Sequence, residues 1–260
     1  MSRIIEGHTV LRFDGELSHL HLLLVEMGGL VDKQLRAALA AMGTEDVKGA
    51  LDVIDGDNDV DELELKVDAE IRSILARRTP VARDLRVVLA CSKVVTDVEQ
   101  IGDEACKLAR IVVQIYEGNG TSPKRELLRD VEKTGRIVTA LLRDAMHVLD
   151  CFDDDGAEEL LVSYQELEED FQSNVRRIAT YMMEDSRNIG HAIRVVLALK
   201  SLERIGSHSK NIAEQIIFLV RGEDVRHRRD LRMEETAARE SRPDVITTEQ
   251  QGRVSPPPGG

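Results

Sequence analysis

The chain repeats a short motif in which a glutamate lies inside a long helical pattern. Glu99-Gln100-Ile101-Gly102-Asp103 returns 104 residues later as Glu203-Arg204-Ile205-Gly206-Ser207. Alternating steps of three and four residues from either glutamate meet mostly apolar or small residues, so each glutamate lies on an inward-leaning helix face. An unpaired buried carboxylate is costly. The repeat therefore predicts two similar halves, each with an acid that needs a metal ion, a basic side chain or another polar partner.

The composition favours packed helices and argues against nucleic acid as a partner. Hydrophobic residues make up 42% of the 260 positions, but aromatic residues only 3%, with no Trp, and charged residues reach 32%. A core of Leu, Ile, Val and Ala is typical of helical bundles. The net charge is -13, whereas a protein that binds a phosphate backbone needs clustered Lys and Arg. We therefore expect no nucleic-acid partner.

Helix start and stop signals predict six long helices in two groups of three. Thr44, Thr79 and Ser122 are predicted N-caps, Gly56 a bend, and 153–156 a turn. One predicted helix carries an unbroken apolar heptad, typical of a bundle seam: Val87, Cys91, Val94, Val98, Ile101, Ala105, Leu108, Val112 and Ile115. No segment alternates with period two. The predicted helices cover 16–42, 44–78, 79–117, 122–149, 157–183 and 187–221.

These patterns predict an all-α fold of two pseudo-symmetric antiparallel three-helix bundles followed by a disordered tail. The first bundle is expected over 14–120, the second over 121–223 and the tail over 224–260, whose mixed charges and Pro-Gly end cannot bury enough apolar area to fold. The three cysteines lack metal-site or disulfide spacing and are predicted to be small, reduced core residues. With no signal-peptide pattern and no span-length apolar run, we expect a soluble cytoplasmic protein.

Several separated motifs resemble those of the PhoU family of phosphate-uptake regulators. They include the two glutamate motifs and three further segments, 76–86, 181–187 and Met27-Gly28-Gly29. The resemblance covers about 14–229. It implies a negative regulator of the phosphate-starvation response and of high-affinity phosphate uptake, which contacts the ATPase subunit of the phosphate ABC transporter and a phosphate-sensing histidine kinase. It also implies homodimerisation, and contact with the membrane only through these partners.

The resemblance further implies a metal motif, Glu/Asp-x-x-x-Asp, in each repeat. Glu99 and Asp103 match it, one helical turn apart, and acids of the neighbouring helix, Asp61 or Glu64, could complete the shell around iron or another hard cation. The second copy has lost one carboxylate, because Ser207 follows Glu203. Glu168 is its matching helper. The predicted metal ligands are Glu99, Asp103, Glu203, Asp61, Glu64 and Glu168.

Two other interpretations of these acids stay open. Asp103 could pair with Lys107 and Glu99 with an arginine across the bundle, with Lys210 and Arg204 as counter-charges of the second glutamate. Alternatively the acids could contact another protein. An enzyme is not expected, because a di-iron site needs Glu-x-x-His on two helices and the chain has it once, at Glu16. The competing function is therefore a metal-binding bundle for storage or sensing.

Overall fold

The computed structural model describes residues 11–117, 123–184 and 189–225, and side chains from residue 14 onward, and in these ranges it contains helices and no strand. The all-α prediction is confirmed. Apart from Asp224 and Val225, the predicted tail lies outside the described residues. The helices are α1 Leu11–Thr44, α2 Val47–Asp55, α3 Asp57–Arg78, α4 Ala82–Tyr116, α5 Arg125–Cys151, α6 Asp154–Glu184 and α7 Ile189–Arg221.

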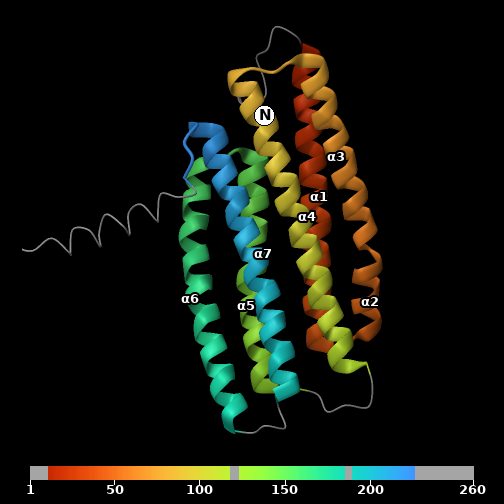
Figure 1. Ribbon diagram of the computed structural model, residues 1–260, viewed down its shortest axis with the longest axis vertical. Helices are drawn as coiled ribbons and strands as arrows, with labels where there is room; N and C mark the ends of the chain where they lie inside the picture. The colour runs from red at the N-terminus through yellow and green to blue at the C-terminus, as the bar shows by residue number, and fades with distance from the viewer. Residues whose placement is uncertain (1–10, 118–122, 185–188, 226–260) are drawn as a thin grey trace, which may run out of the picture. The chain divides into compact units, whose positions relative to one another are not determined.

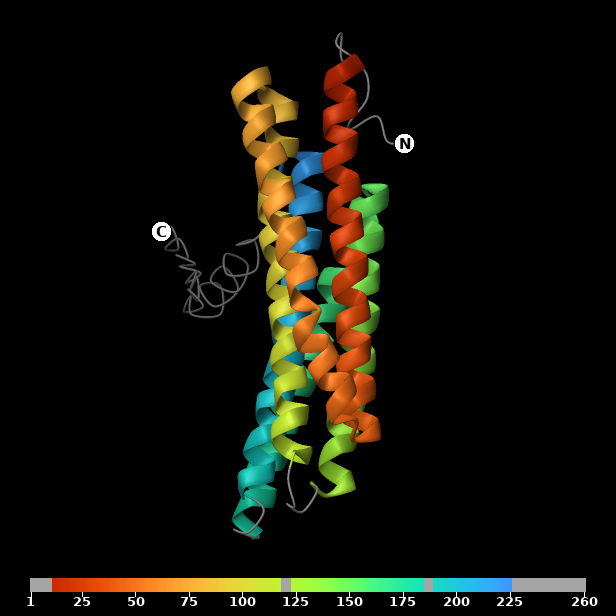
Figure 2. The ribbon, with the colours of Figure 1, turned by 90° about the vertical axis from the view of Figure 1, so that its right-hand side faces the viewer.

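The helices form two bundles that correspond to the two sequence repeats (Figure 1). The first contains α1, α4 and the pair α2 and α3, and the second contains α5, α6 and α7. Helix α4 packs along α7 and α1 along α5, so the repeats share two long contacts. Figure 2 shows α1 and α5 side by side. Because these contacts join the repeats into one compact unit that ends at Asp224, separate domains over 14–120 and 121–223 stay a prediction.

The core consists of aliphatic side chains, as the composition predicts. All nine heptad positions of α4, from Val87 to Ile115, are at most 7% exposed. Each repeat also brings its motif glycine against a neighbouring helix: a Cβ on Gly102 would lie 3.3 Å from Val31 of α1, and one on Gly206 would overlap Leu167 of α6. Glycine at these positions lets the motif helices approach their neighbours closely.

The first repeat differs from prediction at its helix ends. Thr44 ends α1, and Asp46 caps α2 instead, because its carboxylate accepts a hydrogen bond from the Gly49 amide at 3.0 Å. The predicted bend at Gly56 is a break between α2 and α3. Thr79 ends α3 in the left-handed region with φ of 45°, so it does not cap α4.

Later helix ends follow the same pattern of small shifts. Helix α5 begins after Lys124, and Ser122 lies outside the described residues. Asp153 caps α6 by accepting a hydrogen bond from the Gly156 amide at 3.1 Å, so the predicted turn is mostly the first turn of α6. The predicted stop at Gly222 is confirmed, because this glycine has φ of 78° directly after α7.

The prediction that all three cysteines are core residues is wrong for one of them. Cys91 and Cys106 are buried and have free thiols, and burial raises the pKa of both to about 12. Cys151 is exposed, because it ends α5 on the face turned away from the core. In the described part of the chain, no helix combines the length and apolar character needed to cross a bilayer.

Candidate functional site

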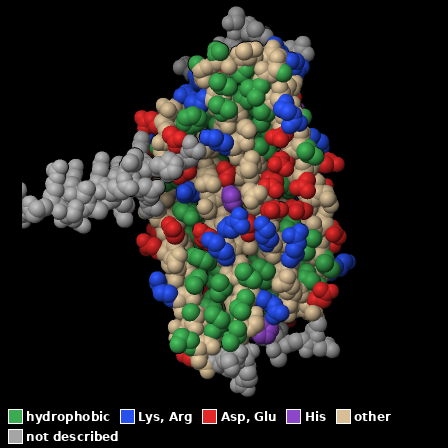
Figure 3. All heavy atoms as spheres, in the orientation of Figure 1, with side chains coloured by type: hydrophobic (Ala, Val, Ile, Leu, Met, Phe, Trp, Pro, Cys, Tyr) green, Lys and Arg blue, Asp and Glu red, His purple; other side chains and the backbone are tan. Residues whose placement is uncertain are grey.

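The motif glutamate of the first repeat faces a group of carboxylates on the neighbouring helix. Glu99 and Asp103 lie on α4, and Asp61 and Glu64 lie on α3. Charge interactions link these four side chains, because the others of the group help to raise the pKa values of Asp61, Glu64 and Glu99. Figure 3 shows acidic side chains gathered over α3 and α4. The four predicted ligands of the first repeat therefore form one acidic cluster.

Burial and mutual repulsion raise the pKa of three of these carboxyls. Burial is the largest cause for Asp61, Glu64 and Glu99. Neighbouring carboxylates add to it, since Glu99 and Asp61 raise the pKa of Glu64, and Asp103 raises that of all three. The negative charges are thus incompletely compensated, and a cation near them would be stabilised.

Direct contacts compensate part of this charge. Asp103 pairs with Lys107 at 3.4 Å, as the ion-pair interpretation predicts. The predicted arginine partner of Glu99 is wrong, because Glu99 instead accepts a hydrogen bond from its neighbour Gln100 at 2.6 Å. Lys107 is shared between two carboxylates, because its Nζ also lies 3.0 Å from Oε1 of Glu104. The cluster therefore keeps several carboxylates without a cation of their own.

The second repeat surrounds its glutamate with different chemistry. Glu203 pairs with Lys200 and accepts a hydrogen bond from the Tyr164 hydroxyl at 3.4 Å. Burial raises the pKa of Tyr164 to about 12, and the charges of Glu203 and Glu168 add to the shift, whereas a hydrogen bond with Ser207 opposes it. The two predicted acids of this repeat thus act on the same tyrosine, and Lys200 neutralises Glu203.

The counter-charges predicted for the second glutamate lie elsewhere. Lys210 pairs with Glu214 at 3.4 Å. Arg204 crosses to the first repeat and pairs with Glu104 of α4 at 2.8 Å. Both predictions are wrong. Lys210 pairs with a different acid one turn later on its own helix α7, and Arg204 pairs across the α4–α7 contact.

Sequence reasoning missed four residues of these two sites. Asp57 raises the pKa of both Asp61 and Glu99. Gln100, Tyr164 and Lys200 contact the motif glutamates. Tyr164 stands one helical turn before Glu168, and Lys200 nearly one turn before Glu203, so helical spacing could have indicated both.

A third polar group joins the repeats between α4 and α7. Asp97 of α4 accepts hydrogen bonds from Nδ1 of His208 and Nδ2 of Asn211, both at 2.9 Å. Asp97 and His208 are 15% and 17% exposed. His208 is thus held by a hydrogen bond to the other repeat.

The positions of the acids bear on whether they could hold a metal ion. Among the residues that the structure describes, no three His, Cys, Asp or Glu side chains converge closely enough to hold a metal ion. The raised pKa values of Asp61, Glu64 and Glu99 nevertheless fit a site that attracts a hard cation. Metal binding by the six predicted ligands therefore stays a prediction.

The fold and both motifs define a duplicated helical-bundle protein with one motif glutamate per repeat. The family model described as the PhoU domain matches the chain twice, over 24–112 and 131–216. The chain belongs to the PhoU family. The two matches start 107 residues apart and end 104 apart, so they coincide with the two bundles.

Relatives match over most of their length. The phosphate-specific transport system accessory protein PhoU homolog of Pseudomonas putida is 41% identical over 85% of both chains. The accessory protein PhoU of Escherichia coli is 34% identical over 86% of this chain and 91% of its own.

Two solved structures are similar to this one. The crystal structure of PhoU from Pseudomonas aeruginosa has a TM-score of 0.78 and 38% identity, and covers 81% of this chain and 100% of its own. The phosphate transport system regulatory protein PhoU from Streptococcus pneumoniae has a TM-score of 0.73 and covers 82% of this chain and 98% of its own. At 22% identity, the second supports the fold alone.

Proposed function

We propose that this protein regulates high-affinity phosphate uptake and represses the phosphate-starvation response when phosphate is plentiful. The observation that carries the proposal is the match to phosphate-specific transport accessory proteins at 34–41% identity over at least 85% of both chains. In this proposal the protein acts through contacts with the ATPase subunit of the phosphate transporter and with a phosphate-sensing histidine kinase. It works in the cytoplasm, as a homodimer, and meets the membrane through these partners.

Exposed apolar side chains support a function in protein contact. Leu85 and Leu89 in the first turns of α4 are 36% and 46% exposed. Ile189 and Ile193 take the corresponding positions in α7, 104 residues later, and are 41% and 49% exposed. Hydrophobic side chains lie at both ends of the face in Figure 3. Exposed apolar side chains that gather on a surface mark interaction sites, so these two pairs, at the starts of α4 and of α7, are candidates for binding the partners.

The test is a strain from which the gene is deleted and which carries a reporter of a phosphate-starvation promoter. The strain should express the reporter at high phosphate, and the intact protein should restore repression. A Leu89→Asp/Ile193→Asp double variant should fold, with unchanged helical circular dichroism, yet fail to restore it. Val162→Asp, on α6 and 59% exposed, is the matched control. Normal repression in the deletion strain would contradict the proposal.

The alternative function, a bundle that stores or senses a metal, has one observation in its favour. Burial and mutual repulsion raise the pKa values of Asp61, Glu64 and Glu99, which a bound cation would lower. Co-purification separates the two functions. If metal-stripped protein retains the transporter ATPase or the kinase, regulation does not require the metal. If only metal-loaded protein retains either partner, the carboxylates are part of the regulatory function.

A further inference from the structure

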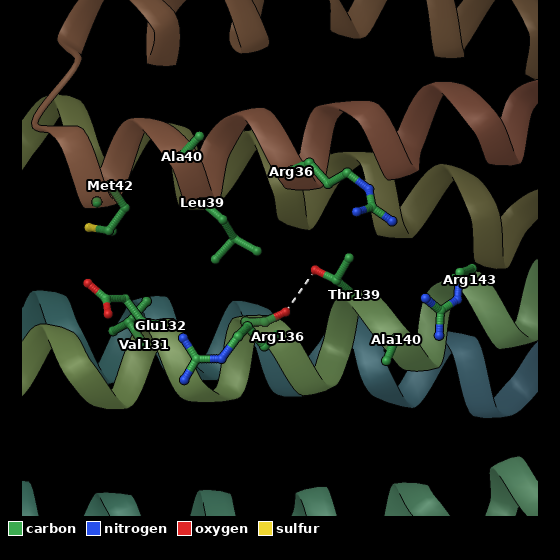
Figure 4. A pocket seen from close by; sticks show the side chains of 12 residues that line it. Arg36, Leu39, Ala40, Met42, Val131, Glu132, Arg136, Thr139, Ala140 and Arg143 are labelled. Atoms are coloured by element: carbon green, nitrogen blue, oxygen red, sulfur yellow. Dashed lines mark hydrogen bonds between the residues drawn. The ribbon is translucent and has the colours of Figure 1, made fainter.

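A cleft of about 500 Å³ lies between α1 and α5 and is distinct from both acidic motifs. Figure 4 shows Arg36 reaching from α1 into the gap above Thr139, with Arg136 and Arg143 on α5 on either side of it. Most of the other lining residues are small or aliphatic, among them Leu39, Ala40, Gly43, Gly135 and Ala140. Pockets for small molecules commonly have this size and an apolar lining with a few convergent polar groups.

The cleft follows from how the two repeats meet. A Cβ on Gly135 of α5 would lie 2.5 Å from Cδ2 of Leu39, so this glycine admits the leucine of α1. Gly28 of α1 admits Met146 of α5 in the same way. The two contacts involve equivalent positions of the two repeats. Gly135 stands 107 positions after Gly28, and Met146 stands 107 positions after Leu39. The crossing is therefore a duplicated, reciprocal contact, and the small residues around it leave the space open.

The arginines belong to the same duplicated set. Arg143 follows Arg36 by 107 positions, so the pseudo-symmetry places one arginine on each side of the crossing. Arg136 adds a third guanidinium between Arg143 and the Met42 end of the cleft. Four charged residues line the cleft, three positive and one negative. In a chain with a net charge of -13, this is a local excess of positive charge.

The guanidiniums keep hydrogen-bond donors for a ligand. Arg36 uses its Nε for Asp32 at 2.7 Å, and that pair leaves both terminal nitrogens unused. Arg143 contacts Asp144 through Nε and Nη2, at 3.4 and 3.3 Å, where both side chains are more than half exposed. Within the described ranges, Arg136 makes no ion pair. Glu132 is the one carboxylate in the lining, and it lies at the Met42 end.

We propose that this cleft binds a small phosphorylated molecule, inorganic phosphate or a phosphate ester. Guanidinium groups match the geometry of phosphoryl oxygens and bind them in pairs of hydrogen bonds. A phosphoryl group presents three oxygens in different directions, which suits three arginines on two helices better than the two coplanar oxygens of a carboxylate. The small and aliphatic residues of the lining leave room for the organic group of a phosphate ester. The inference does not depend on the regulatory function proposed above.

Calorimetric titration of the full-length protein tests the proposal, with orthophosphate and AMP as probes. We expect both to bind, and binding to weaken with added salt. Tighter binding of AMP than of orthophosphate would assign the site to an ester, and equal binding would assign it to the phosphoryl group alone. No binding of either probe at about 10 mM would overturn the proposal.

Matched variants locate the binding. The double variant Arg36→Gln/Arg136→Gln should bind both probes about tenfold more weakly or worse, because it lacks two charge-assisted hydrogen-bond donors. Arg72→Gln is the control, since Arg72 pairs with Asp68 four residues earlier on α3, as Arg36 pairs with Asp32. Glu132→Gln should tighten binding, because it removes the one negative charge of the lining. Unchanged affinity in the double arginine variant, with an unchanged thermal midpoint, would overturn the site.

Discussion

Glu104 of α4 and Arg204 of α7 form an ion pair that joins the two repeats. Oε1 of Glu104 lies 2.8 Å from Nη1 of Arg204, and the glutamate is 1% exposed. Lys107 contacts the same oxygen at 3.0 Å. A carboxylate this deeply buried depends on its partners, because an unpaired buried charge is strongly unfavourable. The contact between the motif helices therefore includes a polar link as well as apolar packing.

Loss of Arg204 should destabilise the protein. Arg204→Gln leaves Glu104 with Lys107 as its cation, and we expect the free energy of unfolding to fall by about 1 to 3 kcal/mol. Urea melts measure it. Arg194→Gln, on the same helix, should change it by less than about 0.5 kcal/mol. Glu104→Gln/Arg204→Gln should lose less than the sum of the two single changes, and strict additivity would show that the pair is not coupled.

The heptad of α4 should tolerate no charge. Val98→Asp places a carboxylate where a fully buried valine packs, and we expect the free energy of unfolding to fall by about 3 kcal/mol or more. Val162→Asp makes the same exchange at a site that is 59% exposed, and its effect should be small. Equal effects of the two changes in denaturant melts would contradict the observed phase of α4.

The sequence predicted the buried faces well because burial follows helical periodicity. All nine positions of the α4 heptad are buried, since one long helix has to keep one face toward the core. Helix ends were less predictable. Thr79 could cap a helix by its chemistry, but it ends α3 in the left-handed region, and α4 starts at Ala82. Capping depends on how the chain enters the next helix, which local sequence does not determine.

The candidate site was predictable in part, since the predicted ligand set already placed Asp61 and Glu64 of α3 with Glu99 of α4. Spacing placed Asp103 one turn from Glu99 and beside Lys107. It could not indicate that Arg204 crosses to Glu104, because that contact depends on the relative rotation of α4 and α7. The arginine cleft escaped prediction for the same reason, since it exists only where α1 and α5 cross.

Neutralising Glu99 should stabilise the metal-free protein at neutral pH. Burial and the neighbouring carboxylates raise the pKa of Glu99 in the folded state. The folded protein therefore loses stability relative to the unfolded chain as pH rises from the ordinary glutamate pKa of about 4.3 through the raised value. Glutamine does not ionise, so the Glu99→Gln variant does not lose stability in this way. Its free energy of unfolding should exceed that of the parent above this pH range, and the difference should vanish below about pH 4.

Denaturant melts between pH 4 and pH 7, with a chelator present, measure the effect of Glu99→Gln. The control is Glu159→Gln, an exposed position on α6, which should shift the curve little at any pH. If the Glu99→Gln variant is less stable than the parent throughout this range, the prediction is contradicted. The hydrogen bond from Gln100 to the Glu99 carboxylate would then stabilise the fold more than the neighbouring carboxylates destabilise it.

Metal binding should differ between the two repeats. Binding of a hard cation strengthens with each anionic oxygen, and Glu99 has Asp103, Asp61 and Glu64 close by, whereas Glu203 is neutralised by Lys200. Calorimetric titration of stripped protein with manganese or iron should show a tighter site that Glu99→Gln/Asp103→Asn abolishes. Ser207→Asp restores the missing carboxylate and should raise affinity or stoichiometry in the second repeat. An unchanged isotherm in the double variant, or no binding by the parent at about 1 mM metal, would leave these acids as ion-pair and hydrogen-bond partners of the bundle.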